Sequence, residues 1–251
     1  MKGPLSYIGG KNRLAKLIIS QIPSHKTYVE PFAGGAQVFF QKEPSDVEIL
    51  NDLSDDIVNF FRICQSHAPE LVRYVQYMIA ARRWFDLLQK TDPVILTDVQ
   101  RAARFFFLQK VEYGGLVAHR NFVLQVVQST HWNPARIPSL IESTAQRLQN
   151  AQIEALPYQK IIRKCDRPST FFYLDPPYYD KKLYQFNFED KDFRELAALL
   201  AGLKGTFILS LNDVPEVRDI FRDFKMQAIQ LAYSAQQKVG RRYGELVIKN
   251  F

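Results

Sequence analysis

The chain contains 251 residues, of which 47 % are apolar and 13 % aromatic, so it can bury a substantial core and is not predominantly disordered. Thirty-three basic and 26 acidic residues give a net charge of +7, which favours an anionic partner, nucleic acid first, without proving one. Two cysteines are too few for a disulfide framework, and the four histidines show no metal-ligand spacing, so we expect no metal site.

The chain shows no sign of membrane targeting. Its N-terminus lacks the apolar stretch of a signal peptide, and no uncharged apolar run approaches the roughly 18 residues that cross a bilayer. We therefore expect a cytoplasmic protein that does not contact a membrane.

Strand-like and helix-like segments alternate at both ends of the chain, and helical periodicity dominates between them. The predicted strands cover Tyr28–Glu30, Val47–Asn51, Ile153–Leu156, Thr170–Leu174 and Phe207–Leu211, followed by a closing hairpin of Ala228–Ser234 and Glu245–Lys249. The predicted helices cover Lys11–Gln21, a segment after Gly35, the regions near 55–90, 97–113 and 138–149, and Val214–Phe224. This order predicts an α/β domain interrupted by a helical insertion.

The positive charge is concentrated in the middle of the chain. Residues 59–150 contain 11 basic and 6 acidic side chains, a net charge of +5. Residues 1–58 contain 6 and 7, a net charge of −1, and residues 151–251 contain 16 and 13, a net charge of +3. If the protein binds an anionic polymer, the insertion is the expected place.

The most specific motif follows the predicted strand Thr170–Leu174, which ends in Asp175-Pro176-Pro177-Tyr178. Open α/β sheets bind ligands at the carboxyl ends of their strands, and two prolines hold the backbone rigid there. The turn therefore presents a carboxylate, a fixed carbonyl and an aromatic face to one ligand. An exocyclic base amine needs those groups, namely two acceptors for its N–H bonds and a ring for stacking. The alternative is an ordinary strand-to-turn junction.

Two weaker motifs precede it. Residues 29–36 form a Gly-Gly turn at the end of the first predicted strand, where glycine lets a ligand approach the backbone closely. About 20 residues later, Asn51-Asp52 ends the next strand, at the position that binds ribose hydroxyls in Rossmann-like sites. The alternative for Asp52, or for Ser54, is the N-cap of the following helix. The segment Gly9-Gly10-Lys11 lacks the spacing of a phosphate loop, which disfavours a nucleotide triphosphatase.

Together, and in this order, four segments resemble the α-class, Dam-like N6-adenine DNA methyltransferases. These segments are Tyr7-Ile8-Gly9-Gly10-Lys11, Glu30 to Ala36, Asn51-Asp52 and Asp175 to Tyr178. The resemblance implies a Rossmann-like, S-adenosylmethionine-dependent methyltransferase sheet in an α/β fold. A helical DNA target-recognition domain of about residues 59–147 would be inserted into a catalytic domain made of residues 1–58 and 148–251.

The resemblance also implies roles for individual residues. Asp175 and the Pro176 carbonyl would accept hydrogen bonds from the target amine, with Pro177 shaping the turn and Tyr178 stacking on the flipped adenine. S-adenosylmethionine would be the cofactor. Its expected binding residues are Tyr7, Lys11, Glu30, Pro31, Phe32, Gly34, Asp52 and Asp175.

Double-stranded DNA is the implied substrate, methylated with strict or relaxed sequence specificity. The candidate DNA-binding residues are Arg82, Arg83, Arg101, Arg104, Lys110, Arg120 and Arg136 in the insertion, and Lys238, Arg241 and Arg242 in the C-terminal hairpin loop. For any single residue of the insertion, a solvated helix face is a simpler explanation than base readout. For the three loop residues, an exposed loop and a grip on the DNA backbone are equally simple explanations. Two other functions stay open, an RNA base methyltransferase with the same motif and an inactive DNA-binding relative. We also expect a monomer or weak dimer, with a restriction endonuclease as a possible counterpart.

Overall fold

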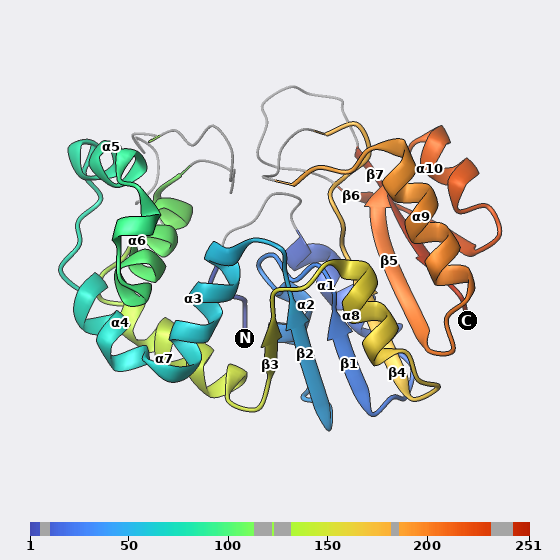
Figure 1. The fold of residues 1–251 in the computed structure, drawn as a ribbon, viewed down its shortest axis with the longest axis horizontal. Helices are drawn as coiled ribbons and strands as arrows, with labels where there is room; N and C mark the ends of the chain where they lie inside the picture. Colours follow the sequence, from blue (N-terminus) through green and yellow to red (C-terminus); the bar gives the residue numbers. More distant parts are fainter. Residues whose placement is uncertain (6–10, 113–121, 123–131, 182–185, 232–242) are drawn as a thin grey trace.

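Seven strands form one mixed sheet in the order β3-β2-β1-β4-β5-β7-β6 (Figure 1). The computed structural model describes residues 1–5, 11–112, 122, 132–181, 186–231 and 243–251. All neighbouring strands are parallel except for β7, which runs antiparallel to both β5 and β6. The strands are β1 (Thr27–Glu30), β2 (Val47–Asn51), β3 (Gln152–Glu154), β4 (Thr170–Leu174), β5 (Thr206–Asn212), β6 (Lys225–Leu231) and β7 (Tyr243–Lys249).

Both faces of the sheet are buried, because apolar side chains point alternately to two separate hydrophobic clusters. On β4, Phe171 and Tyr173 belong to one cluster, whereas Phe172 and Leu174 belong to the other. Helices contribute to each cluster and form the outer layers of an α/β fold. The first face packs against α1 (Lys11–Ile19) and α2 (Gln37–Gln41), and the second against α8 (Tyr158–Cys165), α9 (Asp190–Ala201) and α10 (Pro215–Ile220).

A block of helices lies between β2 and β3 in the chain and beside the β3 edge of the sheet in Figure 1. Its buried side chains, among them Phe60 and Phe106 with rings 5.2 Å apart, belong to the same cluster as Tyr28 and Phe171 on the sheet. The helical segment therefore shares a continuous core with the sheet. The block consists of α3 (Asp55–Ser66), α4 (Ala68–Val75), α5 (Arg82–Lys90), a short 3-10 helix (Pro93–Ile95), α6 (Asp98–Val111) and α7 (Ile137–Leu148).

A buried ion cluster joins this block to the sheet. Arg147 of α7 donates to both carboxylate oxygens of Glu48 on β2, at 2.5 and 2.8 Å, and to the carbonyl of Phe39 at 2.8 Å. Its guanidinium also lies 3.6 Å from the centre of the Phe39 ring. Lys42 donates to Glu48 from the other side at 2.5 Å. These two cations hold the pKa of Glu48 below its usual value, although burial alone would raise it.

Replacing Arg147 by methionine is expected to lower the free energy of unfolding by about 3 kcal/mol, because a buried carboxylate loses one of its cations. Arg147→Lys is expected to recover part of this loss, since lysine keeps the charge but not the paired hydrogen bonds or the ring contact. Urea unfolding measures the change. The exposed Arg163→Met on α8 is the matched control, and equal losses in the two methionine variants would contradict a special role for Arg147.

The structure confirms the predicted strands at Val47–Asn51 and Thr170–Leu174 to the residue, and it confirms the antiparallel pairing of the last two strands. Several boundaries were wrong. The two hairpin strands begin at Lys225 and Tyr243, not at Ala228 and Glu245. The first predicted helix ends at Ile19, not Gln21. The last ends at Ile220, not Phe224, because β6 begins at Lys225. The strand predicted to reach Leu156 ends at Glu154, since the amide of Leu156 binds the side chain of Asn51 instead.

Candidate active site

The strand order reverses at β1, which lies between β2 and β4. In open α/β sheets, the crevice at the carboxyl ends of the strands on either side of such a reversal is the usual ligand site. The sequence places its candidate residues at these ends, with Glu30 ending β1, Asp52 following β2 and Asp175 following β4. Burial is the main cause that raises the pKa of Glu30, and the neighbouring Asp175 adds a smaller contribution in the same direction.

Glu30 is only 1 % exposed and is held from two sides. Its Oε1 accepts a hydrogen bond from the Tyr28 hydroxyl at 2.6 Å and from the amide of Phe39 at 2.8 Å. Burial, more than any other effect, raises the pKa of Glu30 to about 8, and it also raises the pKa of Tyr28. At neutral pH Glu30 is therefore mainly protonated. It supports the turn and α2 and does not supply negative charge to the crevice.

The Gly-Gly turn is fixed by β2. The amide of Ala33 donates to the carbonyl of Asn51 at 2.9 Å, and the amide of Gly34 donates to Asp52 Oδ2 at 2.8 Å. Gly34 has a φ of 49°, a left-handed conformation suited to glycine. Ala36 has a φ of 48°, which is uncommon for a residue with a Cβ, and its methyl group is buried in the core. The Ala36 methyl therefore points away from solvent.

Asp52 links the Gly-Gly turn to the approach to α3. Its second oxygen accepts the amide of Ser54 at 2.8 Å, just before α3. Ser54 is the N-cap residue of α3 by position, but its side chain makes no capping bond. Burial raises the pKa of Asp52, and the amides that it accepts oppose that rise. A carboxylate has about four acceptor sites, so both Asp52 oxygens keep capacity for ligand hydroxyls.

Asn51 and an aromatic cluster complete this side of the edge. No role was predicted for Asn51 itself, and of the aromatic cluster only Phe32 was a predicted site residue. The Asn51 side chain donates to the carbonyls of Pro31 and Leu156, both at 2.9 Å. It therefore links the end of β2 to the segments that follow β1 and β3. Half-buried Phe32 lies 5.2 Å from Tyr158 and 5.7 Å from Phe188, measured between ring centres. A polar asparagine at the end of a buried strand is a signal that could have identified Asn51. Tyr158 had no such signal, because it begins a helix that was not predicted.

The Asp-Pro-Pro-Tyr turn is attached to β5. Ser210, fully buried on that strand, donates to Asp175 Oδ1 at 3.2 Å and lies 3.0 Å from the hydroxyl of Tyr173. Pro176 is buried, whereas Pro177 and Tyr178 are half-buried. The structure thus brings Asp175 and Tyr178 to the edge that also holds the Gly-Gly turn and Asp52.

The same turn has two further anchors. The Tyr178 hydroxyl donates to Glu245 Oε1 on β7 at 2.5 Å. The side chain of Asn212, on β5, accepts the amide of Tyr179 at 2.9 Å and donates to its carbonyl at 3.2 Å. None of Ser210, Asn212 or Glu245 was predicted, since they come from strands whose pairing the sequence does not reveal.

Two predicted DNA-binding residues have intramolecular partners instead. Arg104 is buried and donates to the carbonyls of Leu88 and Gln89, where α5 ends. Arg101 binds Asp55 and Asp56, which raise the pKa of its guanidinium and tie α6 to α3. A phosphate would have to compete with these partners for either guanidinium.

The other candidates differ in exposure. Arg82, Arg83 and Arg136 are exposed, although Arg82 also donates to the carbonyl of Phe122 at 3.2 Å. Lys110 is half-buried, and burial lowers the pKa of its ammonium group. The remaining candidates lie outside the described residues, or have side chains that do. They are Tyr7, Lys11, Arg120, Lys238, Arg241 and Arg242.

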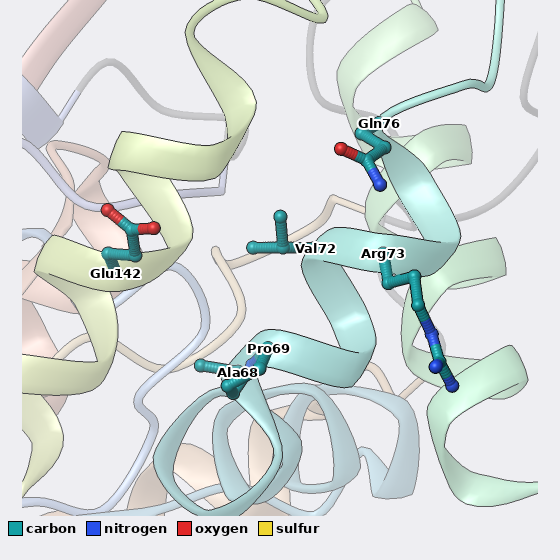
Figure 2. A pocket seen from close by; sticks show the side chains of 6 residues that line it. All are labelled: Ala68, Pro69, Val72, Arg73, Gln76 and Glu142. Carbon is teal, nitrogen blue, oxygen red and sulfur yellow. The ribbon is translucent and has the colours of Figure 1, made fainter.

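A hollow of about 310 Å³ lies in the helical block, between α4 and α7 (Figure 2). It is lined by Ala68, Pro69, Val72, Arg73 and Gln76 of α4 and the loop after it, and by Glu142 of α7. Its lining includes none of the site residues above, so it is not the active site. Within the described ranges, no three His, Cys, Asp or Glu side chains are grouped to hold a metal ion. No helix there is both long and apolar enough to cross a membrane.

Comparison with known proteins identifies the family. The model of the family described as D12 class N6 adenine-specific DNA methyltransferase matches residues 7–235. The type II methyltransferase M1.LlaDCHI of Lactococcus lactis subsp. cremoris is 25 % identical, over 98 % of this chain and 94 % of its own. The type II methyltransferase M.CviBI of Paramecium bursaria Chlorella virus NC1A is 23 % identical over the whole of both chains. The DNA adenine methylase of Haemophilus influenzae is 24 % identical, over 95 % of this chain and 89 % of its own. This chain therefore belongs to the D12 class of N6 adenine-specific DNA methyltransferases.

Proposed function

We propose that the edge formed by the carboxyl ends of β1 and β4 is where this DNA adenine N6 methyltransferase brings its cofactor and its target base together. One observation supports this most strongly. The Asp-Pro-Pro-Tyr turn lies beside the Gly-Gly turn at the strand-order reversal, with Asp175 held by Ser210. Membership of the family does not support the alternatives of an RNA base methyltransferase or an inactive relative.

The residues on the β1 and β2 side fit S-adenosylmethionine, which supplies a methyl group on a cationic sulfonium. Asp52 is a half-buried carboxylate whose two oxygens already accept amides but keep capacity for ribose hydroxyls. Phe32 offers a ring face, and Gly34 leaves the backbone open at the turn. Pro31 and Glu30 support the turn from behind, through Asn51 and through Phe39. Tyr7 and Lys11 are proposed cofactor contacts on sequence grounds alone.

On the β4 side, the turn would activate the target amine. The N6 lone pair of adenine is delocalised into the ring, which makes it a poor nucleophile. Hydrogen bonds from the amine to Asp175 and to the Pro176 carbonyl favour a pyramidal nitrogen and localise that pair. When bound, S-adenosylmethionine would supply the methyl group for direct transfer to that nitrogen, and the surplus N6 proton would leave along its hydrogen bond to Asp175. Proximity and fixed acceptors provide the acceleration, without a covalent enzyme intermediate.

The target adenine must leave the duplex to reach this turn. Unstacking costs a few kcal/mol, and stacking on Tyr178 offsets part of it. The test is transfer of a labelled methyl group to duplex DNA, single-stranded DNA and RNA of the same sequence. We expect label on adenine N6 in duplex DNA, and label on cytosine or only on RNA would contradict the proposal. Mapping methylated adenines after expression in a methylation-free host then identifies the target sequence.

We propose residues 59–147 as the target-recognition region, although their core is continuous with that of the sheet. Exposed Arg82 and Arg83 begin α5, which lies on the side of the molecule to which β5 points (Figure 1), and exposed Arg136 precedes α7. This region contains most of the net positive charge, and phosphate contacts would dominate its affinity for DNA.

Binding of duplex DNA is expected to weaken steeply with salt. If Arg83 or Arg136 contacts a phosphate, Arg83→Gln or Arg136→Gln should each reduce the slope of log affinity against log salt by about 0.9. Fluorescence anisotropy with a labelled duplex measures the slope. Arg163→Gln, an exposed arginine on α8 outside this region, is the control. Slopes equal to that of the parent protein would remove Arg83 and Arg136 from the interface.

A restriction endonuclease counterpart is a further proposal, supported by the type II names of two relatives. To test it, DNA from cells that express this protein is digested with a panel of restriction endonucleases. Protection from cleavage at one sequence would identify the site that a counterpart endonuclease would recognise. A monomeric or weakly dimeric state in the cytoplasm stays a prediction.

A further inference from the structure

Three polar side chains behind the Asp-Pro-Pro-Tyr turn come from the neighbouring strands β5 and β7. Ser210 and Asn212 are two positions apart on β5, so their side chains leave the same face of the sheet. Asn212 pairs in register with Glu245 of β7. Because β7 is antiparallel, its N-terminal end lies at the same edge as the carboxyl end of β5. Glu245 therefore reaches the active edge from the start of its strand, as Asn212 does from the end of its own.

We propose that Glu245 is a positioning residue that sets the ring plane of Tyr178 before the target base arrives. This inference rests on the proposed stacking role of Tyr178. The phenol hydroxyl donates to Glu245 Oε1 at 2.5 Å, and Glu245 itself is 2 % exposed. Rotation about the Cβ–Cγ bond of a tyrosine is soft, so packing alone leaves a half-buried ring some freedom. The Tyr178 oxygen lies on the axis of that rotation, so the hydrogen bond anchors the hydroxyl end of the ring. Because a phenolic O–H prefers to lie in the ring plane, a fixed acceptor then favours one orientation of the ring.

The backbone of the turn is held in the same way one residue later. Asn212 binds both the amide and the carbonyl of Tyr179, so the chain after Tyr178 cannot shift along the strand edge. Asn212 and Glu245 are paired residues of adjacent strands, so backbone and ring are fixed to one rigid part of the sheet. A stacking face must be in place before the flipped base reaches it, and such preorganisation lowers the cost of binding.

The packing of β7 does not by itself require an acid at this position. Leu246, Val247 and Ile248 follow Glu245 and are completely buried, so an apolar residue would suit the fold better. A buried carboxylate is costly unless it is hydrogen-bonded. The contact with Tyr178 provides such a bond and places it at the reactive turn.

The test compares Glu245→Leu, Glu245→Gln, Tyr178→Phe and the double variant Tyr178→Phe/Glu245→Leu. Tyr179→Phe is the matched control, because that hydroxyl binds Asp190 at the exposed start of α9. Three quantities are measured for each protein: kcat and KM for duplex DNA, cofactor affinity by calorimetry, and the fluorescence of 2-aminopurine at the target adenine. The fluorescence reports base flipping, which a purely structural role of Glu245 would not change.

We expect Glu245→Leu to lower kcat/KM for DNA by about tenfold or more and to weaken the flipping signal, with cofactor affinity within about twofold of the parent. Glu245→Gln keeps an acceptor oxygen and should recover much of the loss. The kcat/KM of the double variant should be no lower than that of the less active single variant, because both substitutions remove the same hydrogen bond. Additive losses, or a Glu245→Leu protein with the kinetics of Tyr179→Phe, would overturn the inference. A parent protein that does not methylate adenine in duplex DNA would instead overturn the proposed function.

Discussion

Asp175→Ala is expected to lower kcat for adenine methylation by about 10²- to 10³-fold, the usual loss when a group that stabilises the transition state is removed. The carboxylate lies at the end of β4, held by the hydroxyl of Ser210 at 3.2 Å, so its oxygen faces a fixed direction. Removing it leaves the amine with only the Pro176 carbonyl as an acceptor. Cofactor affinity should fall by much less than kcat, because Asp175 is only one of the expected cofactor contacts and the proposed ribose contact is Asp52. Steady-state transfer of a labelled methyl group and calorimetry measure the two quantities.

Asp175→Asn refines this experiment. Asparagine keeps one acceptor oxygen but loses the negative charge, so an intermediate loss would assign part of the effect to charge and part to the hydrogen bond. Asp219→Ala, an exposed acid on α10, is the control for a lost carboxylate. If Asp175→Ala transfers methyl groups at the parent rate, the proposed role of the Asp-Pro-Pro-Tyr turn is wrong.

The sequence predicts the parts of the site that are adjacent to strand ends. Apolar runs bounded by turn residues fix β2 and β4, so Asp52 and Asp175 fall at the carboxyl edge without knowledge of the fold. Ser210, Asn212 and Glu245 were not found, because they reach the turn through strand pairing. A sequence predicts a closing hairpin but not the register that places Glu245 opposite Asn212.

Helices were predicted unevenly. The pattern missed α9, although Phe193, Leu196 and Leu200 recur at helical spacing and are buried. It also missed α8, in which only Ile161 and Ile162 are buried among charged residues. Both helices cover the second face of the sheet, and α8 brings Tyr158 to Phe32.

Charge was the least informative feature at the level of single residues. A basic composition indicated an anionic partner, and the family bears this out. It could not separate exposed Arg83 from Arg104, whose guanidinium caps the end of another helix. Nor could it foresee that Arg101 binds acids about 45 positions earlier in the chain. Partners distant in sequence decide which charges remain available to DNA.

Glu30→Gln is expected to change the pH dependence of folding more than any other single substitution considered for this protein. Folding raises the pKa of Glu30 from 4.5 to about 8, so between these values the folded state binds more protons than the unfolded state. The stabilisation from Glu30 is therefore complete below about pH 4.5 and is lost as pH rises to about 8. Within that window the loss approaches about 1.4 kcal/mol per pH unit.

Glutamine suits this test because its Oε1 can still accept from Tyr28 and Phe39, the two donors that Glu30 binds. The variant cannot ionise, so the parent-minus-variant difference in free energy of unfolding isolates Glu30. Urea unfolding between pH 5 and pH 9 should show that difference falling with pH and levelling above about pH 8. The opposite dependence of Glu48, whose pKa is lowered, falls below this window and cancels in the difference.

Exposed Glu43→Gln, close to Glu30 in the chain, is the control for removing a carboxylate as such. A parent-minus-variant difference for Glu30→Gln that is flat with pH would mean that Glu30 is ionised in the folded protein. Its carboxylate would then add a negative charge to the site that contains Asp175. The site would be more negative than with a neutral Glu30. A falling difference would leave Asp52 and Asp175 as the acids that face the cationic cofactor, with Glu30 as a neutral support for the turn between them.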